Sequence, residues 1–158
     1  MTVLHKHPGS YDEGAYGIVF FDEQGYAIKV FKRRPDAPEE HLKAVFQSEV
    51  EAYRIANESN ELRALVPEFF GVITCEQVLD EAGNDISGVF HMALAYKMRK
   101  IEGVFRKCGL QDEKLKGAFS EAGIRHTKDA SVLFEDGAIR CIVDIAVQEH
   151  ELWHQCFF

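Results

Sequence analysis

The chain begins with a polar stretch that Gly9 and Gly14 interrupt, and short apolar runs follow it. Two short β-rich runs lie at 17–21 and 26–31, and the turn between them ends in Gly25. Such runs joined by a glycine-bearing turn predict a β-hairpin. After the proline-bearing stretch 32–38, apolar residues recur at helical spacing, which predicts a helix over about 38–57.

The rest of the chain carries further strand patterns and one more helix. Apolar runs at 69–73 and 89–95 flank a polar turn and predict two strands. A helical pattern over about 112–122 is followed by a last predicted hairpin over 132–143, whose turn is at 135–137. Because strands and helices are grouped, the order predicts an α+β domain and not a series of βαβ units.

Composition narrows the class of protein. The 158 residues suit one domain, and 46% hydrophobic residues are enough for a packed core. The net charge of −8 repels phosphate backbones, so we expect no nucleic-acid partner. No apolar run reaches the length of a membrane helix, and residues 1–8 lack the apolar stretch of a secretory signal. With four widely separated cysteines, the sequence is typical of a reduced cytoplasmic protein without membrane association.

Three separated features carry candidate chemistry. Gly14 and Gly17 lie at a strand–turn–strand, where glycines let backbone amides approach a phosphate closely. Lys29 lies inside an apolar strand and Glu49 within the apolar stripe of the next helix, so each charge would explain the burial of the other. Asp144 directly follows an apolar strand, where a carboxylate suits Mg²⁺. Taken singly, each residue also fits a solvent-facing or turn position.

In order and spacing, these features resemble the protein kinases. Residues 14–19, Gly-Ala-Tyr-Gly-Ile-Val, look like the end of the kinase glycine-rich loop, with Asp12 in place of its first glycine. Residues 27–29, Ala-Ile-Lys, look like the strand whose lysine holds the α- and β-phosphates. Residues 48–53 are similar to the helix segment whose glutamate pairs with that lysine, and 94–97 fall where the family has its gatekeeper and hinge.

The resemblance continues into the metal site and the catalytic loop. Residues 144–146 resemble the Asp-Phe-Gly motif but keep only its aspartate. At family spacing, Lys128 matches the loop lysine, while His126 stands at the catalytic aspartate and Ser131 at the metal-binding asparagine. A small gap would instead make His126 the loop histidine and Asp129 the base. The ungapped version is preferred because the gap crowds the remaining spacing, but the identity of the base stays open.

The fold implied by the resemblance is a minimal protein-kinase-like fold across residues 1–158. It would have an antiparallel β-rich N-lobe with one helix, and the hinge, over about 12–96, and a much reduced C-lobe over about 97–158. Only 14 residues follow Asp144, so we expect neither an activation segment nor substrate-docking helices. Such a short domain is similar to the truncated kinases of some bacteria and their phages, including effectors delivered into host cells.

The function implied by the resemblance is an ATP- and Mg²⁺-dependent phosphotransferase with a degenerate catalytic loop. The residues expected to bind ATP are Gly14, Gly17, Lys29, Glu49, Ala95 and Lys97. The residues expected to be catalytic are His126, Lys128 and Asp129, and those expected to bind Mg²⁺ are Asp144 and Ser131. The alternative is a nucleotide-binding pseudokinase that serves as a protein-binding module, so a protein substrate or partner is expected in both cases.

A competing motif lies near the end of the sequence. His150, Glu151 and His154 form an HExxH pattern, in which two histidines bind Zn²⁺ and the glutamate acts as a base. That chemistry needs a third protein ligand, usually downstream, and only four residues follow. A zinc hydrolase is therefore the third hypothesis, and a closing apolar helix or tail is the preferred interpretation of this segment.

Overall fold

The computed structural model describes residues 2–149 and divides them into two compact units. The first unit contains the chain up to Phe46 together with Phe70–Lys100, and the second contains Gln47–Phe69 and the described residues from Ile101 onward. The division runs through a long helix, so the second half of that helix groups with the later part of the chain. The predicted α+β class is confirmed.

The first unit is built on a five-stranded sheet with the order β2-β3-β4-β7-β5. Its strands are β2 Tyr11–Glu13, β3 Gly17–Phe21, β4 Tyr26–Lys32, β5 Phe69–Ile73 and β7 Phe90–Arg99. The pairs β2–β3, β3–β4 and β4–β7 are antiparallel, and β3–β4 is the hairpin predicted from the sequence.

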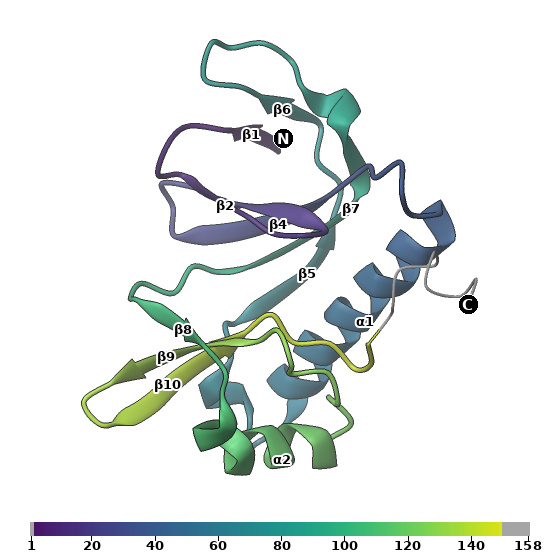
Figure 1. The fold of residues 1–158 in the computed structure, drawn as a ribbon. Helices are drawn as coiled ribbons and strands as arrows, with labels where there is room; N and C mark the ends of the chain where they lie inside the picture. Colours follow the sequence, from purple (N-terminus) through teal and green to yellow (C-terminus); the bar gives the residue numbers. More distant parts are fainter. Residues whose placement is uncertain (1, 150–158) are drawn as a thin grey trace. The chain divides into compact units, whose positions relative to one another are not determined.

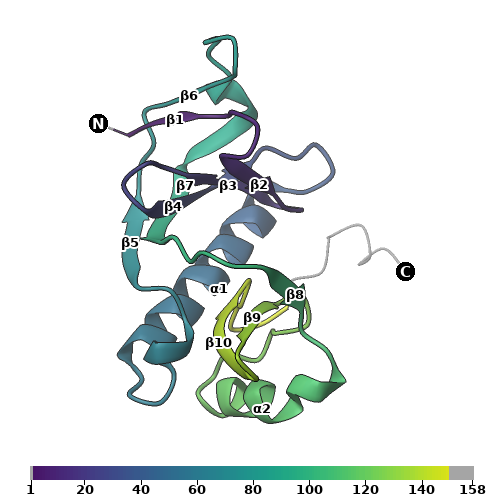
Figure 2. The ribbon, with the colours of Figure 1, turned by 90° about the vertical axis from the view of Figure 1, so that its left-hand side faces the viewer.

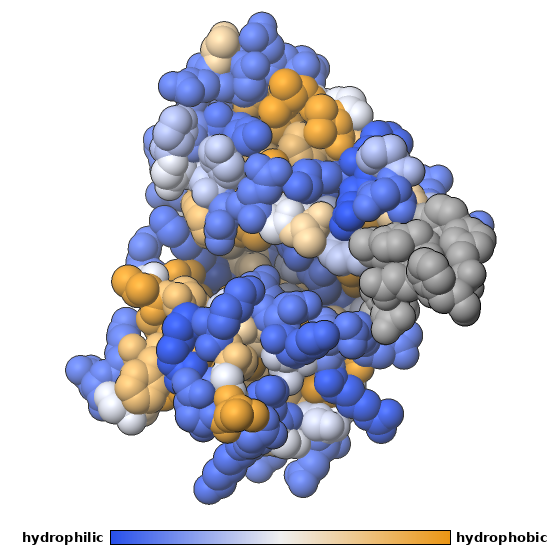
Figure 3. Space-filling model, in the orientation of Figure 1, coloured by the Kyte–Doolittle hydropathy of each residue, from blue (hydrophilic) through white to orange (hydrophobic). Residues whose placement is uncertain are grey.

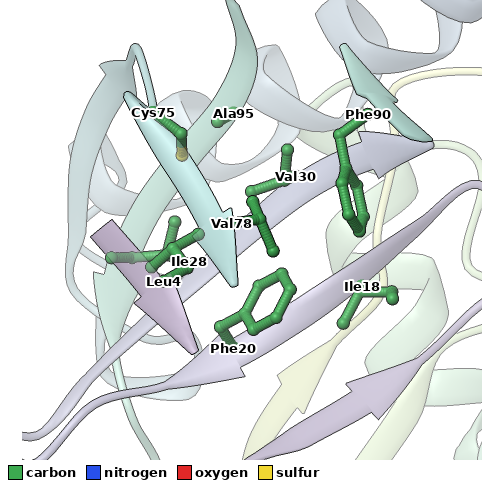
Figure 4. Packing of buried hydrophobic residues seen from close by; sticks show 9 residues of the cluster. All are labelled: Leu4, Ile18, Phe20, Ile28, Val30, Cys75, Val78, Phe90 and Ala95. Atoms are coloured by element: carbon green, nitrogen blue, oxygen red, sulfur yellow. The ribbon is translucent and has the colours of Figure 1, made fainter. Parts of the chain in front are cut away.

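A small parallel pair covers one face of this sheet. β1 Val3–His5 pairs with β6 Gln77–Leu79. Because side chains alternate along a strand, Ile28 and Val30 of β4 point to this face and Lys29 points to the other. Figure 4 shows the resulting hydrophobic cluster, which consists of Leu4, Ile18, Phe20, Ile28, Val30, Cys75, Val78, Phe90 and Ala95.

Helix α1, Glu39–Glu58, is the helix predicted over about 38–57. It begins directly after Pro38 and carries Glu39 and Glu40 in its first turn, where the helix dipole favours negative charge. In the first unit, Phe46 of α1 packs edge-to-face against Phe31 of β4, with ring centres 5.4 Å apart. Since Phe31 shares its sheet face with Lys29, this half of α1 covers the face opposite to the β1–β6 pair.

The second unit contains a three-stranded antiparallel sheet with the order β10-β9-β8 (Figures 1 and 2). Its elements are β8 Phe105–Lys107, helix α2 Glu113–Glu121, β9 Ser131–Glu135 and β10 Ala138–Val143. The predicted second helix and last hairpin are therefore confirmed. Among the described residues from Ile101 onward, the largest fully buried apolar side chains are those of Phe119, Ile124, Ile142 and Ile145.

Within residues 2–149, none of the helices combines the length and the apolar character that crossing a membrane requires.

Candidate functional site

The glycine turn of the first unit is a tight loop between β2 and β3. The Gly14 N–H donates to the Gly17 carbonyl at 2.8 Å, and the Tyr16 carbonyl accepts from the Lys32 N–H at 2.8 Å. A Cβ at Gly17 would lie 2.5 Å from the Val30 carbonyl oxygen, so the close approach of β3 and β4 requires glycine there. A Cβ at Gly14 would meet nothing closer than 3.6 Å. Packing therefore explains Gly17 but not Gly14.

Side-chain contacts fix the tip of this turn. The Tyr16 hydroxyl lies 3.0 Å from His41 Nε2 of α1. The Arg34 guanidinium lies 5.2 Å from the centre of the Tyr16 ring and donates to the Ala15 carbonyl at 3.2 Å. The turn is thus anchored to the start of α1 and to the basic stretch after β4, while Gly14 and Ala15 stay exposed.

Lys29 lies in the middle of the sheet. It pairs with Val19 of β3 and with Tyr96 of β7. Its Nζ is 5.3 Å from the centre of the Phe31 ring, and its side chain is half-buried. A half-buried ammonium group on an apolar sheet face favours an anionic neighbour, whether a carboxylate or a phosphate. Lys29 belongs to the first unit and Glu49 to the second, and their pairing stays a prediction.

The other two nucleotide-binding candidates of the first unit point to the opposite sheet face. Ala95 is buried in the hydrophobic cluster. Lys97 pairs with Ile28 of β4, and its Nζ lies 3.8 Å from the centre of the Tyr26 ring. The structure therefore does not bring the side chains of Ala95 and Lys97 together with that of Lys29.

The strand register instead places two other β7 side chains on the sheet face of Lys29: that of Tyr96, which the sequence indicated only as part of the segment 94–97, and that of Met98, which it did not indicate. Tyr96 pairs directly with Lys29, and Met98 pairs with Ala27, two residues away on the same face. Both side chains are buried. Alternation within β7 could have found them only once the register with β4 was known.

In the second unit, the β9–β10 hairpin brings two metal-ligand candidates to one end. Ser131 pairs with Val143, the residue directly before Asp144. Asp144 is exposed and has a φ of 63°, in the left-handed region that Asp adopts more readily than most residues. The carboxylate and the hydroxyl are hard oxygen ligands of the kind that Mg²⁺ takes, so this donor set fits the ion.

The predicted catalytic loop lies beside the chain that follows Asp144. The His126 N–H donates to the Ala146 carbonyl at 3.0 Å, and the Ala146 N–H donates back to the His126 carbonyl at 3.1 Å. The Arg125 N–H donates to the Val147 carbonyl at 3.2 Å. This short antiparallel bridge joins the loop 124–131 to the segment 144–148.

The two alternatives for the base lie together in this loop. His126 Nε2 is 3.4 Å from Asp129 Oδ2. A neutral imidazole has one ring nitrogen without a proton, which can act as a proton acceptor. Lys128 is 75% exposed, and its Nζ lies 3.9 Å from Glu149 Oε1, a surface pair that holds the side chain weakly.

Tyr53 of α1 contacts Asp144. The sequence indicated this tyrosine only as part of the apolar stripe of the helix. Tyr53 is 1% exposed, and its hydroxyl oxygen accepts the Asp144 N–H at 3.1 Å. Burial, and then the charge of Asp144, raise the pKa of Tyr53 well above its ordinary value, and the charge of Glu49 adds to this effect. Tyr53 is therefore a neutral phenol. Glu49 itself is buried on the preceding turn of α1.

Among the residues that the structure describes, no three His, Cys, Asp or Glu side chains form a group that could hold a metal ion. Magnesium does not need such a group, since it keeps several waters and is bound through one or two carboxylates plus substrate phosphates. His150, Glu151 and His154 lie outside the described residues, so the zinc hypothesis stays a prediction.

Comparisons of the chain with models of protein families, with curated proteins and with solved structures give no match. The assignment of a function therefore rests on the sequence motifs and on the geometry within each unit.

Proposed function

We propose that this chain is an ATP- and Mg²⁺-dependent phosphotransferase of the protein-kinase type, with a minimal kinase-like fold and a degenerate catalytic loop. One local structure in the second unit carries the proposal. Ser131 and Asp144 lie at the same end of the β9–β10 hairpin, and the bridge from His126 to Ala146 joins the candidate catalytic loop to the Asp144 segment. This is the sequence order in which kinases carry their catalytic loop, second metal ligand and metal-binding aspartate.

The chemistry asked of these residues is mostly positioning and charge neutralisation. Asp144 and Ser131 would hold Mg²⁺, which supplies positive charge to the phosphates. Lys128, exposed at the loop surface, would contact the transferring phosphoryl group. In the first unit, Lys29 would bind phosphate oxygens through its ammonium group, and the exposed turn at Gly14 would let a phosphate approach the backbone closely.

The acceptor hydroxyl would lose its proton to His126, held by Asp129. General acid–base catalysis typically contributes about 10²–10⁴-fold to a reaction rate, and here a histidine would take the place of the usual carboxylate base. We therefore expect slow phosphoryl transfer.

The first test is thermal unfolding with ATP, in the presence and absence of Mg²⁺. Ligand at about 100 times its Kd stabilises a protein by roughly 2.7 kcal/mol, which corresponds to a shift of roughly 5–10 °C for a chain of this size. We expect this shift in the wild type and its loss in Asp144→Asn, because the amide has lost the charge. Asn also tolerates the left-handed conformation, so the variant should fold.

Asp136→Asn is the matched control, because Asp136 also has a positive φ, 52°, and lies in the turn at the other end of the same hairpin. It should keep the full magnesium-dependent shift. A full shift in Asp144→Asn would show that the metal-site assignment is wrong.

The second test is phosphoryl transfer from radiolabelled ATP to a generic protein acceptor and to the chain itself. We expect slow transfer that Lys29→Met abolishes, because methionine keeps the apolar stem but not the ammonium group. Transfer that survives Lys29→Met would come from a contaminating kinase.

A second candidate function is a nucleotide-binding pseudokinase that holds another protein. Large apolar side chains are exposed in the second unit, with Val104 at 87%, Leu110 at 86% and Phe134 at 49%. Figure 3 shows hydrophobic surface in the region of β8 and the end of β9. Exposed apolar patches often mark protein-binding surfaces. A magnesium-dependent shift without any phosphoryl transfer would favour this function.

A further inference from the structure

Two hydroxyl groups of α1 bind the segment that begins at Asp144. The Tyr53 hydroxyl oxygen accepts the Asp144 N–H at 3.1 Å. Ser48 Oγ accepts the Gln148 N–H at 3.1 Å and donates to the Gln148 carbonyl at 3.1 Å. Ser48 is 4% exposed and Tyr53 1%. Buried hydroxyl groups of α1 thus bind the backbone at both ends of the segment 144–148, which has no regular secondary structure of its own.

The opposite side of this segment is bound by backbone. Ala146 exchanges two hydrogen bonds with His126, and the Val147 N–H donates to the Ser48 carbonyl at 3.1 Å. The segment therefore has fixed partners at residues 146, 147 and 148. At the start of the segment, the Asp144 N–H is bound by the Tyr53 hydroxyl.

The conformation of Asp144 makes this bond important. With a φ of 63°, the residue is in a region that L-residues populate rarely, and such a residue persists where its surroundings hold it. The backbone dihedrals of a residue determine the direction in which its Cα–Cβ bond leaves the chain. A partner that fixes the N–H of Asp144 therefore also constrains the direction in which its side-chain carboxylate leaves the backbone.

We infer that Tyr53 is a positioning residue for Asp144: the bond from the Asp144 N–H to the phenol oxygen lets α1 hold the backbone of the metal-binding carboxylate. The inference rests on the proposed function, because it takes Asp144 as a magnesium ligand. It adds to that function a residue that touches neither nucleotide nor metal.

The first test measures the bond without any ligand. Amide hydrogen exchange by NMR should show the Asp144 N–H protected in the wild type. In Tyr53→Phe, which keeps the buried ring, this amide should exchange about five-fold faster or more, because one hydrogen bond is lost. The amides of His126 and Ala146 keep their partners and should not change. Unchanged exchange at Asp144 would overturn the inference.

The second test measures ATP affinity by calorimetry, with Mg²⁺ and with EDTA. Tyr53→Phe should lower the affinity for ATP about five-fold in Mg²⁺ and leave the affinity in EDTA unchanged. A purely structural role would lower both affinities together, so the difference between the two conditions is the informative quantity.

Asn57→Ala is the matched control for general destabilisation. The Asn57 amide binds the Tyr53 and Pro67 carbonyls at 2.8 and 3.2 Å, and its oxygen accepts the Phe69 N–H at 3.0 Å. Its removal weakens the end of α1 one turn after Tyr53 but leaves the phenol in place. This variant should unfold at a lower temperature and keep the full gain in ATP affinity from Mg²⁺.

The failures of the two proposals can be told apart. If Mg²⁺ adds nothing to the ATP affinity of the wild type, the proposed function is wrong, and the positioning role is overturned with it even where the exchange experiment detects the bond. If Mg²⁺ adds affinity in the wild type and adds as much in Tyr53→Phe, the proposed function stands and the positioning role is overturned.

Discussion

The two units position their candidate loops by different physical means. In the first unit, the turn 14–17 is set by the paired strands β3 and β4, which approach so closely at Gly17 that a side chain does not fit. In the second unit, backbone hydrogen bonds join the segment 144–148 to the loop 124–131 and to Ser48, and the hydroxyls of Ser48 and Tyr53 bind the two ends of the segment. The first arrangement requires that no side chain be present at Gly17. Part of the second depends on the hydroxyl groups of Ser48 and Tyr53, each of which a single substitution can remove.

The largest expected effect comes from filling the close approach in the first unit. Gly17→Ala puts a Cβ 2.5 Å from the Val30 carbonyl oxygen, so β3 and β4 must separate. Overpacking of this kind costs about 1–3 kcal/mol, and we expect the upper end because the opposing atom is backbone. Urea unfolding measures the loss.

Gly14→Ala is the matched control for that experiment, because a Cβ at Gly14 has 3.6 Å to its nearest neighbour. Its stability should stay within about 0.5 kcal/mol of the wild type. Equal destabilisation by the two variants would contradict the claim that the strand approach, rather than the turn, requires glycine.

The next effect concerns a polar contact of the second unit. Asp112, whose side chain is 1% exposed, accepts two hydrogen bonds from Arg106 at 2.8 and 3.1 Å and one from the Gly109 N–H at 2.9 Å. Hydrogen bonds to charged groups are worth about 1.5–3 kcal/mol, so Asp112→Asn should destabilise the protein by about that amount at pH 7. The surface pair of the half-buried Lys116 with the exposed Glu113, at 3.7 Å, gives the control Glu113→Gln, which should cost less than about 0.5 kcal/mol.

The same contact predicts a pH dependence. The hydrogen bonds from Arg106 hold the pKa of Asp112 below its ordinary value. A carboxyl with a lowered pKa in the folded state stabilises the protein above its unfolded pKa of about 3.9 and loses that contribution as the pH falls. The difference in unfolding free energy between wild type and Asp112→Asn should therefore shrink between pH 5 and pH 2. A difference that is constant over this range would refute the assignment.

The smallest effect tests the hydroxyl contact at the far end of the Asp144 segment. Ser48→Ala removes both bonds between Ser48 Oγ and the Gln148 backbone and should cost about 1 kcal/mol. In hydrogen exchange the Gln148 amide should lose protection, whereas the Val147 amide, bound to the backbone carbonyl of residue 48, should keep it. Loss at both amides would mean that the segment has detached as a whole.

The sequence predicts the longer elements of this fold because their periodicity extends over enough residues to be recognised. The hairpin β3–β4, both α-helices and the hairpin β9–β10 fall at their expected positions. It misses β1, β6 and β8, which are three residues long, and it implies β2, of the same length, only through the strand–turn–strand at Gly14. A pattern of apolar and polar residues only three residues long cannot be distinguished from a loop. Whether such a segment forms a strand depends on its tertiary partners.

The candidate site is predicted in part for a similar reason. Lys29 and Asp144 stand out because each is a charge in or beside an apolar strand. Tyr53 does not stand out, because its spacing in α1 is that of a core residue and only its hydroxyl contacts Asp144. The placement of Ala95 on the far face of the sheet depends on the register of β7 against β4, which is tertiary information.

The parallel pairing of β1 with β6 has a consequence for how the chain is made. Val3 pairs with Gln77, so β1 has no strand partner until synthesis of the chain has reached that residue. At about 5–20 residues per second, this delay lasts several seconds. During that time the apolar side chains of β3 and β4 that Leu4 and Val78 later cover face water. The covering of this sheet face thus depends on a pairing between residues far apart in the chain, although β3 and β4 themselves are neighbours in sequence.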